Sequence, residues 1–148
     1  MELDQTQHKL YADICTLVEE ARNYVATTAN ATMTLMYWKI GKRLSIELAE
    51  NQESRYGKQI LSELATKLQL QFGERGFQER NIRRMMQFAQ LFPDFQIVSQ
   101  AATKLSWSHF IELIPIKDHL KREFYAVICQ TERWNVKSQL QKMGLVWN

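Results

Sequence analysis

The segment that decides the fold is GERGFQERNIRRMMQF, residues 73–88. Two glycines mark a turn, since glycine adopts positive φ without a steric penalty. The residues that follow have helical periodicity, with Met and Phe on one face and arginines on the other. Residues 58–72 also read as a helix. The pair therefore has the proportions of a helix-turn-helix, a motif whose second helix enters the DNA major groove.

The composition predicts an all-α protein. The chain has 148 residues, of which only five are Gly and two are Pro. Helix-forming residues are plentiful, and no β-branched alternation extends beyond a few positions. Apolar content of 45% is ordinary for a globular protein and excludes a disordered chain.

The first part of the chain predicts one very long helix. From residue 10 to residue 38, apolar or small side chains recur in alternating steps of four and three, which is a heptad seam. A helix of ~40 residues would be about 60 Å long, too long for one small domain to cover. We expect it to break at the Thr-rich stretch 27–32, to fold back, or to pair with another chain. Self-association through this seam and an ordinary core-facing stripe are both consistent with the pattern.

The remaining chain divides into two units. We expect residues 1–54 to form the long helical or oligomerisation segment, residues 55–93 the helix-turn-helix-like unit, and residues 104–143 a second unit of three helices. Residues 94–103 read as the loop that joins these units. Ser106 and Asp118 are predicted N-caps, and Phe124, Tyr125 and Ile128 are predicted to form the buried face of the helix that ends near Thr131.

Charge is unevenly distributed along the chain. Residues 1–54 carry five basic and eight acidic side chains, whereas residues 55–91 carry seven basic and three acidic ones. A local excess of positive charge is typical of a nucleic-acid interface. The alternative interpretations are a solvated basic face, or arginines that pair with carboxylates of the same chain.

The candidate DNA-binding residues follow from this pattern. Residues near the start of the second helix would lie nearest the bases, and other cations would contact phosphates. The base-proximal candidates are Gln78, Arg80 and Asn81, with Arg83 and Gln87 on the same side, and the phosphate candidates are Lys58, Arg75 and Arg84.

Neither catalysis nor a cofactor is expected. No Asp or Glu has a Lys two positions later, as a PDDEXK nuclease would need to hold Mg²⁺ and position water. His109 lies among apolar residues and is predicted to be a core or hydrogen-bonding histidine. Cys15 and Cys129 are far apart and are expected to be reduced and buried. No apolar run is long enough to cross a bilayer, so we expect a cytoplasmic protein without a membrane partner.

Several motifs together resemble the N-terminal domain of the YhcG-type PDDEXK nuclease family. They are Tyr37-Trp38-x-Ile40-Gly41, Tyr56-Gly57-Lys58, Gly76-Phe77-x-x-Arg80-Asn81-x-x-Arg84-Met85-x-x-Phe88, Leu105-Ser106-Trp107-Ser108-His109, and Arg122-x-Phe124-Tyr125 with Trp134. The resemblance covers roughly residues 10–142. Residues 105–140 are also weakly similar to the helical region of ParB-type proteins.

The family resemblance implies a domain that binds DNA or mediates assembly and that precedes a nuclease domain, in genes often found near bacterial defence loci. The chain ends where the nuclease domain would begin. We therefore expect a stand-alone or truncated relative, or a partner nuclease on a separate chain. The expected function is a DNA-binding, self-associating accessory domain that binds double-stranded DNA. The alternative is a protein-interaction module in which the heptad seam and the Trp107/Trp134 unit dock a nuclease or methyltransferase.

Overall fold

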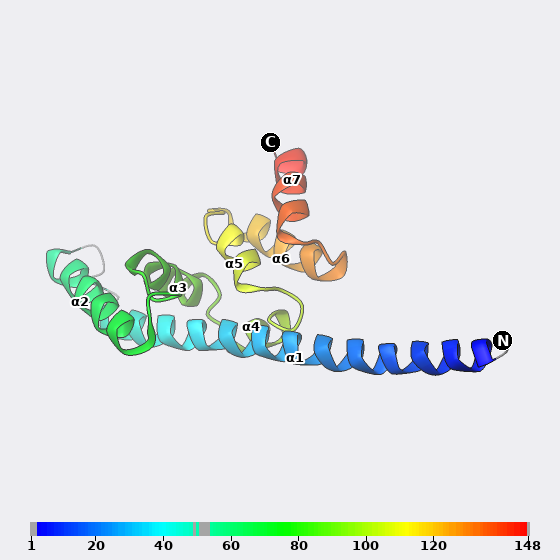
Figure 1. Ribbon diagram of the computed structural model, residues 1–148. Coiled ribbons are helices and arrows are strands. Elements are labelled where there is room, and N and C mark those ends of the chain that lie inside the picture. The colour runs from blue at the N-terminus through cyan, green and yellow to red at the C-terminus, as the bar shows by residue number, and fades with distance from the viewer. Residues whose placement is uncertain (1–2, 49, 51–53, 148) are drawn as a thin grey trace.

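The computed structural model describes residues 3–48, 50 and 54–147. These residues form seven helices and no strand, which confirms the predicted all-α fold. The helices are α1 (Leu3–Leu48), α2 (Arg55–Phe72), α3 (Glu79–Leu91), α4 (Phe95–Ala101), α5 (Trp107–Leu113), α6 (His119–Thr131) and α7 (Val136–Trp147). Figure 1 shows α1 as a long rod, with the other helices gathered along its C-terminal half.

Helix α1 continues without interruption for 46 residues. The expectation that it breaks or folds back near Thr27–Thr32 is wrong, because the helix passes straight through that stretch. Beyond it, Thr34 and Trp38 are buried against the other helices, and the Trp38 indole N–H donates to the backbone oxygen of Phe92 at 2.8 Å. Tertiary contacts of this kind outweigh the low helix propensity of a few threonines.

Helices α1 and α3 cross at very close range. A Cβ atom placed on Gly41 would lie 1.8 Å from the backbone oxygen of Met85. Only glycine lets two helix backbones approach so closely. Gly41 therefore fixes where α3 crosses α1, and with it the direction in which the rest of α3 faces.

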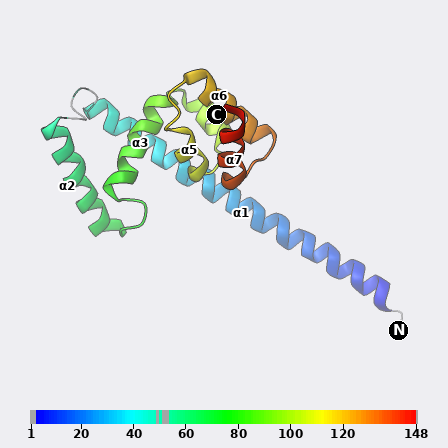
Figure 2. The ribbon, with the colours of Figure 1, turned by 90° about the horizontal axis from the view of Figure 1, so that it is seen from above.

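Helices α2 and α3 form a hairpin at one end of the molecule. Ser54 caps α2 by accepting a hydrogen bond from the Gly57 N–H at 3.0 Å. Gly73 and Gly76 have φ angles of 95° and 89°, so both turn glycines adopt the left-handed region that the sequence predicts. Figure 2 shows that the chain runs towards the turn along α2 and away from it along α3. We call this turn the apex (residues 73–78).

The predicted loop at 94–103 is wrong, because most of it is helix α4. Asp94 caps this helix by accepting from the backbone N–H groups of Gln96 and Ile97. Val98, Ala101 and Ala102 are buried in the core. The segment is therefore part of the core and not a flexible joint, and its short length hid the helical period from sequence reasoning.

Helices α5, α6 and α7 contact one another. The predicted caps are confirmed, with Ser106 accepting from the His109 N–H and Asp118 from the N–H groups of Leu120 and Lys121. Phe124 was predicted to be buried but is exposed, and Ile128 is only half-buried. The buried face of α6 is instead made by Arg122, Tyr125, Ala126 and Cys129. Aromatic content alone did not reveal which side of α6 the core covers.

His109 connects α5 to the loop before α7. Its ring is buried, with Nδ1 accepting from the Ser106 N–H at 3.0 Å and Nε2 lying 2.7 Å from the backbone oxygen of Trp134. These bonds suit the neutral tautomer that carries its proton on Nε2. The predicted structural role of His109 is confirmed.

The two cysteines differ in exposure. Cys129 is buried as predicted, whereas Cys15 on α1 is half-buried, and both are free thiols. Among the described helices, none has both the length and the apolar character needed to cross a membrane.

Candidate nucleic-acid interface

Helix α3 has one buried face and one outward face. Ile82, Met85, Met86, Phe88 and Ala89 are buried, as the sequence predicts. The eight candidate residues divide by exposure: Lys58, Arg75, Gln78, Arg80 and Gln87 are exposed, and Asn81, Arg83 and Arg84 are half-buried. Arg80, Arg84 and Gln87 lie on one line of the outward face, because steps of four and three residues return to the same side of a helix. We call these three residues the α3 stripe.

The arginines of α3 differ in their partners. Arg83 donates to the Glu79 carboxylate at 3.0 Å, so this guanidinium is compensated within its own helix. Among the ion pairs found between described residues, none involves Arg75, Arg80 or Arg84. The alternative of internal salt bridges therefore applies to Arg83, and the ion pairs of the described residues do not extend it to Arg80 or Arg84.

The side chain of Asn81 is engaged inside the fold. Its Nδ2 donates to the backbone oxygen of Gly76 at 2.7 Å, and its Oδ1 accepts from the Trp107 indole N–H at 3.0 Å. Both ends of the amide are therefore occupied, and Asn81 holds the apex against α5. Sequence reasoning missed the role of Trp107, because nothing local links two residues that are 26 positions apart.

The structure separates Lys58 from the other candidates. Lys58 lies in the first turn of α2, whereas Arg75 follows the end of that helix. At 1.5 Å per residue, the length of α2 places the two cations on the order of 20 Å apart. The surface that the structure brings together consists of Arg75 and Gln78 at the apex and the α3 stripe that begins beside them.

Comparison with known protein families identifies the type of domain. The family model for the DUF1016 N-terminal domain matches residues 13–144 of this sequence, which is most of the chain. The chain belongs to this family. This membership confirms the resemblance to the N-terminal domain of the YhcG-like proteins. No curated protein matches the chain. No solved structure matches it either.

A groove in this DUF1016 N-terminal domain lies between the end of α3, α4 and α6. It has a volume of about 340 Å³, and its lining is mainly apolar, including Phe92, Val98 and Ala126. Its wall also includes the charged residues Asp94, Arg122 and Glu123, of which only Arg122 is buried, with 5% of its surface exposed. A buried guanidinium needs several hydrogen-bond acceptors, so its partners determine whether the groove has an unsatisfied cation.

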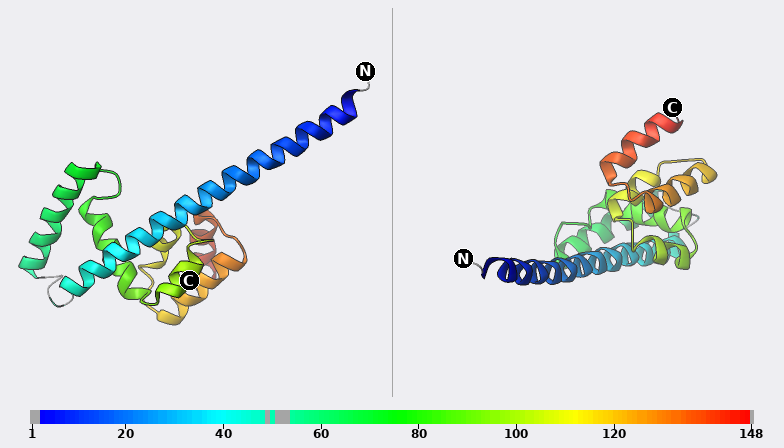
Figure 3. Two further views of the ribbon diagram at one scale, coloured as in Figure 1. Left: turned by 90° about the horizontal axis from the view of Figure 1, so that it is seen from below. Right: turned by 90° about the vertical axis from the view of Figure 1, so that its right-hand side faces the viewer.

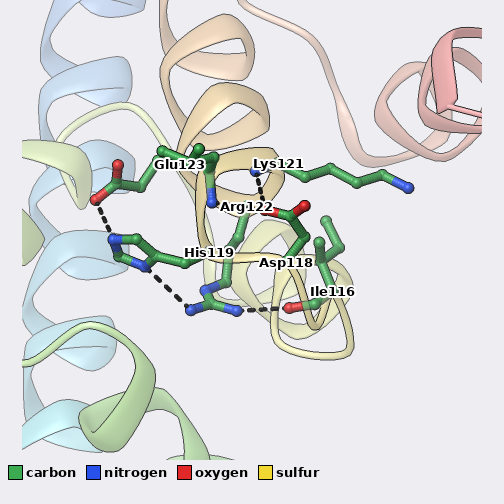
Figure 4. Close-up of polar contacts among 7 residues, drawn as sticks. Ile116, Asp118, His119, Lys121, Arg122 and Glu123 are labelled. Carbon is green, nitrogen blue, oxygen red and sulfur yellow. Dashed lines mark hydrogen bonds and ion pairs between the residues drawn. The ribbon is translucent and has the colours of Figure 1, made fainter.

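Arg122 contacts two of its own neighbours, as Figure 4 shows. Its guanidinium donates to the backbone oxygen of Ile116 and points its other terminal nitrogen at His119 Nδ1, 3.4 Å away. His119 Nε2 lies 3.0 Å from the Glu123 carboxylate. The imidazole thus links the cation to a carboxylate, and we interpret this network as one that anchors the start of α6.

The described part of the chain contains no group of three or more His, Cys, Asp or Glu side chains placed to hold a metal ion. The candidate surface is therefore the apex together with the α3 stripe.

Proposed function

We propose that this DUF1016 N-terminal domain binds double-stranded DNA through the apex and the α3 stripe. The observation that carries the proposal is the contrast between neighbouring arginines. Arg83 is paired with Glu79 at 3.0 Å, whereas Arg80 and Arg84, one helical turn apart, have no carboxylate partner among the described residues. An arginine without an internal partner is suited to phosphate, which its planar guanidinium binds with two parallel hydrogen bonds.

The charge distribution supports an anionic partner. Residues 55–91, which form α2, the apex and α3, have a net charge of +4 from seven basic and three acidic side chains. Residues 1–54 have a net charge of −3 from five basic and eight acidic ones. Because a phosphate backbone attracts a local positive field, DNA would approach the hairpin end of the molecule and not the N-terminal end.

Individual residues receive different roles. Arg80 and Arg84 would neutralise phosphates or, where they reach the groove floor, bind guanine O6 and N7. Gln78 and Gln87 are exposed amides suited to adenine edges. Asn81 is assigned no base contact, because its amide already bonds Gly76 and Trp107. It positions the apex instead.

The domain would act as an accessory to a nuclease in a bacterial defence system, as the family resemblance implies. A DNA-binding module of this kind would bring the nuclease to its substrate, whether the nuclease is part of the same protein or a separate partner. No enzymatic activity is proposed for residues 1–148.

The test is a binding measurement with matched arginine variants. Fluorescence anisotropy of a labelled duplex is recorded over a salt series for the unmodified chain, Arg80→Gln, Arg84→Gln and Arg83→Gln. Loss of one phosphate contact lowers the slope of log affinity against log salt by about 0.9. We expect that change for Arg80→Gln and Arg84→Gln, and a smaller one for Arg83→Gln, because Glu79 already compensates Arg83.

Two results would overturn the proposal. One is the absence of salt-dependent binding to duplex DNA. The other is equal affinity of the unmodified chain, Arg80→Gln and Arg84→Gln at every salt concentration. Circular dichroism of each variant shows whether the helices are intact.

A protein-interaction module is the second candidate function. The observation that favours it is the exposure of apolar side chains along the first half of α1. The Trp107/Trp134 unit gives it less support. Trp107 packs against Tyr37 and Phe88, and Trp134 packs against the core with Lys142 over its ring. Binding to a nuclease or methyltransferase chain without retention on DNA would favour this function.

A further inference from the structure

The first half of α1 lies outside the body of the protein. Every residue from 5 to 29 is exposed except Cys15, which is half-buried. We call this segment the arm, and Figure 1 shows it projecting beyond the other helices. An isolated helix in water draws little stability from its own hydrogen bonds, and helices in proteins are stabilised mainly by packing an apolar face. The arm has such a face, and no described element covers it.

The apolar residues of the arm form one stripe. Seven large apolar side chains are between 42% and 72% exposed: Leu10, Tyr11, Ile14, Leu17, Val18, Tyr24 and Val25. At 100° per residue, these seven and Ala21 fall within an arc of about 140°. The opposite side of the arm is polar and includes Lys9, Thr16, Glu20, Asn23 and Thr27. We call the apolar side the arm stripe.

The arm stripe faces away from the body. Thr34, Trp38 and Gly41 mark the side of α1 that the body covers, and Figure 3 shows the other helices on one side of this rod. Counted at 100° per residue, the middle of the arm stripe lies roughly 150° around the helix from these three residues. A period of 3.5 residues drifts by about 20° per heptad on a straight helix, so over the roughly three heptads from the middle of the arm stripe to Trp38 this drift contributes about 60° of the rotation. The body of the same chain therefore cannot cover the arm stripe, and it does not block a partner.

We propose that the arm stripe binds the arm of a second copy of this chain in antiparallel orientation. About 100 Å² of buried area for each of seven side chains gives roughly 1,400 Å² over both copies, within the range of specific dimer interfaces. The stripe is also self-complementary about a point between Leu17 and Val18. When an antiparallel partner is centred there, Ile14 lies opposite Ala21 in the middle of the arm stripe. Leu10 lies opposite Tyr24 along one edge of the stripe, and Tyr11 lies opposite Val25 along the other edge. Leu17 and Val18 each lie opposite the same residue of the partner.

The antiparallel orientation follows from what lies beyond the arm. Along the line of the arm stripe, α1 continues through Thr32 to Lys39 and Arg43. A parallel dimer would place each of these cations opposite the same cation of the partner. An antiparallel dimer centred between Leu17 and Val18 puts Lys39 and Arg43 of one copy at the opposite end of the pair from Lys39 and Arg43 of the other, so like cations do not meet. The two bodies then lie at opposite ends of the pair.

The antiparallel arrangement has one unfavourable contact. On one flank it brings Asp13 of each copy close to Glu20 of the other. Asp13 is partly compensated by Lys9, 3.5 Å away, and both acidic groups are exposed, so salt screens the repulsion. This contact is specific to the antiparallel arrangement, because a parallel dimer would place Asp13 beside Val18.

The mass of the full chain in solution tests the interface. Light scattering over a concentration series should give twice the chain mass of 17.5 kDa. Leu17→Lys puts two cations at the centre of the interface and should give a monomer. Thr16→Lys puts the same charge on the polar side of the arm and should remain a dimer. A monomeric unmodified chain, or a Leu17→Lys dimer as stable as the unmodified one, would overturn the proposal.

Cross-linking tests the orientation in a Cys15→Ser background. A chain with both Leu10→Cys and Tyr24→Cys should form interchain disulfides on mild oxidation, and each single variant should form few. In addition, Glu20→Lys replaces a repulsive contact by an attractive one and should tighten the dimer by about threefold at low salt. Efficient cross-linking of Leu10→Cys alone would indicate a parallel dimer and would contradict the antiparallel assignment.

Discussion

The indole N–H of Trp107 donates to the side-chain oxygen of Asn81 at 3.0 Å, and the amide of Asn81 donates in turn to the backbone oxygen of Gly76. This chain of two hydrogen bonds connects α5 to the apex through the first turn of α3. Trp107 also packs against residues of both hydrophobic clusters of the core. The position of the candidate DNA-binding surface thus depends on α5.

We expect replacement of Asn81 to act mainly on the free energy of unfolding and less on the affinity for DNA. Asn81→Ala leaves the Trp107 N–H and the Gly76 oxygen without their partner, at a cost of about 1–3 kcal/mol. Asn81→Asp keeps the acceptor for Trp107 and should cost less. Urea unfolding followed by tryptophan fluorescence measures both. Equal stability of Asn81→Ala and the unmodified chain would show that the two hydrogen bonds contribute nothing.

Replacement of Gly41 should disrupt the α1–α3 crossing. In Gly41→Ala the new methyl group would overlap the backbone of Met85, and relief requires the two helices to move apart. We expect a loss of about 3 kcal/mol or more, at the upper end of overpacking costs. Gly144→Ala is the matched control, because no atom lies within 4 Å of its added Cβ. In thermal unfolding, Gly41→Ala should lower the unfolding temperature, whereas Gly144→Ala should leave it unchanged or raise it slightly.

The two turn glycines should differ in their tolerance of alanine. Both have positive φ, so each alanine costs about 1–2 kcal/mol of backbone strain. At Gly73 the space is open, whereas at Gly76 the added Cβ lies 3.2 Å from the Tyr37 hydroxyl oxygen. Gly76→Ala should therefore be the less stable variant in chemical denaturation. If the two variants are equally stable, the contact with Tyr37 is relieved at no cost.

The two cysteines should differ in reactivity. Burial raises the pKa of the Cys129 thiol from 9.0 to about 11, so little thiolate forms at neutral pH. Cys15 is half-buried on the arm and should be alkylated first. Mass spectrometry after brief treatment with iodoacetamide should show one modification in the folded chain and two in denaturant. Rapid labelling of Cys129 under native conditions would contradict its burial.

The raised pKa of Cys129 also predicts a loss of stability at high pH. The unfolded thiol ionises near pH 9 and the folded one near pH 11, so the unfolded state loses protons first. The contribution of this thiol is complete below pH 9 and is lost as the pH rises towards 11. Cys129→Ala should show a shallower decline in the free energy of unfolding over that interval. An unchanged decline would assign the effect to other groups, among them Tyr125, whose pKa is also raised by burial.

The sequence by itself determined the features that depend on neighbours along the chain. Ser106 and Asp118 cap their helices because a short polar side chain reaches the next backbone N–H groups wherever the helix lies. The buried face of α3 followed from its period, and the glycines of the apex followed from the turn between two helices.

The tertiary structure decided what each surface contacts. Nothing in the local sequence showed that Asn81 would be held by Trp107, that Arg122 and not Phe124 would be buried on α6, or that α1 would pass its threonines unbroken. The arm stripe faces away from the body, and the rotation of a seam of period 3.5 around a straight helix of period 3.6 accounts for part of the angle between them. These outcomes depend on contacts between residues far apart in the chain, and local propensity carries no information about such contacts.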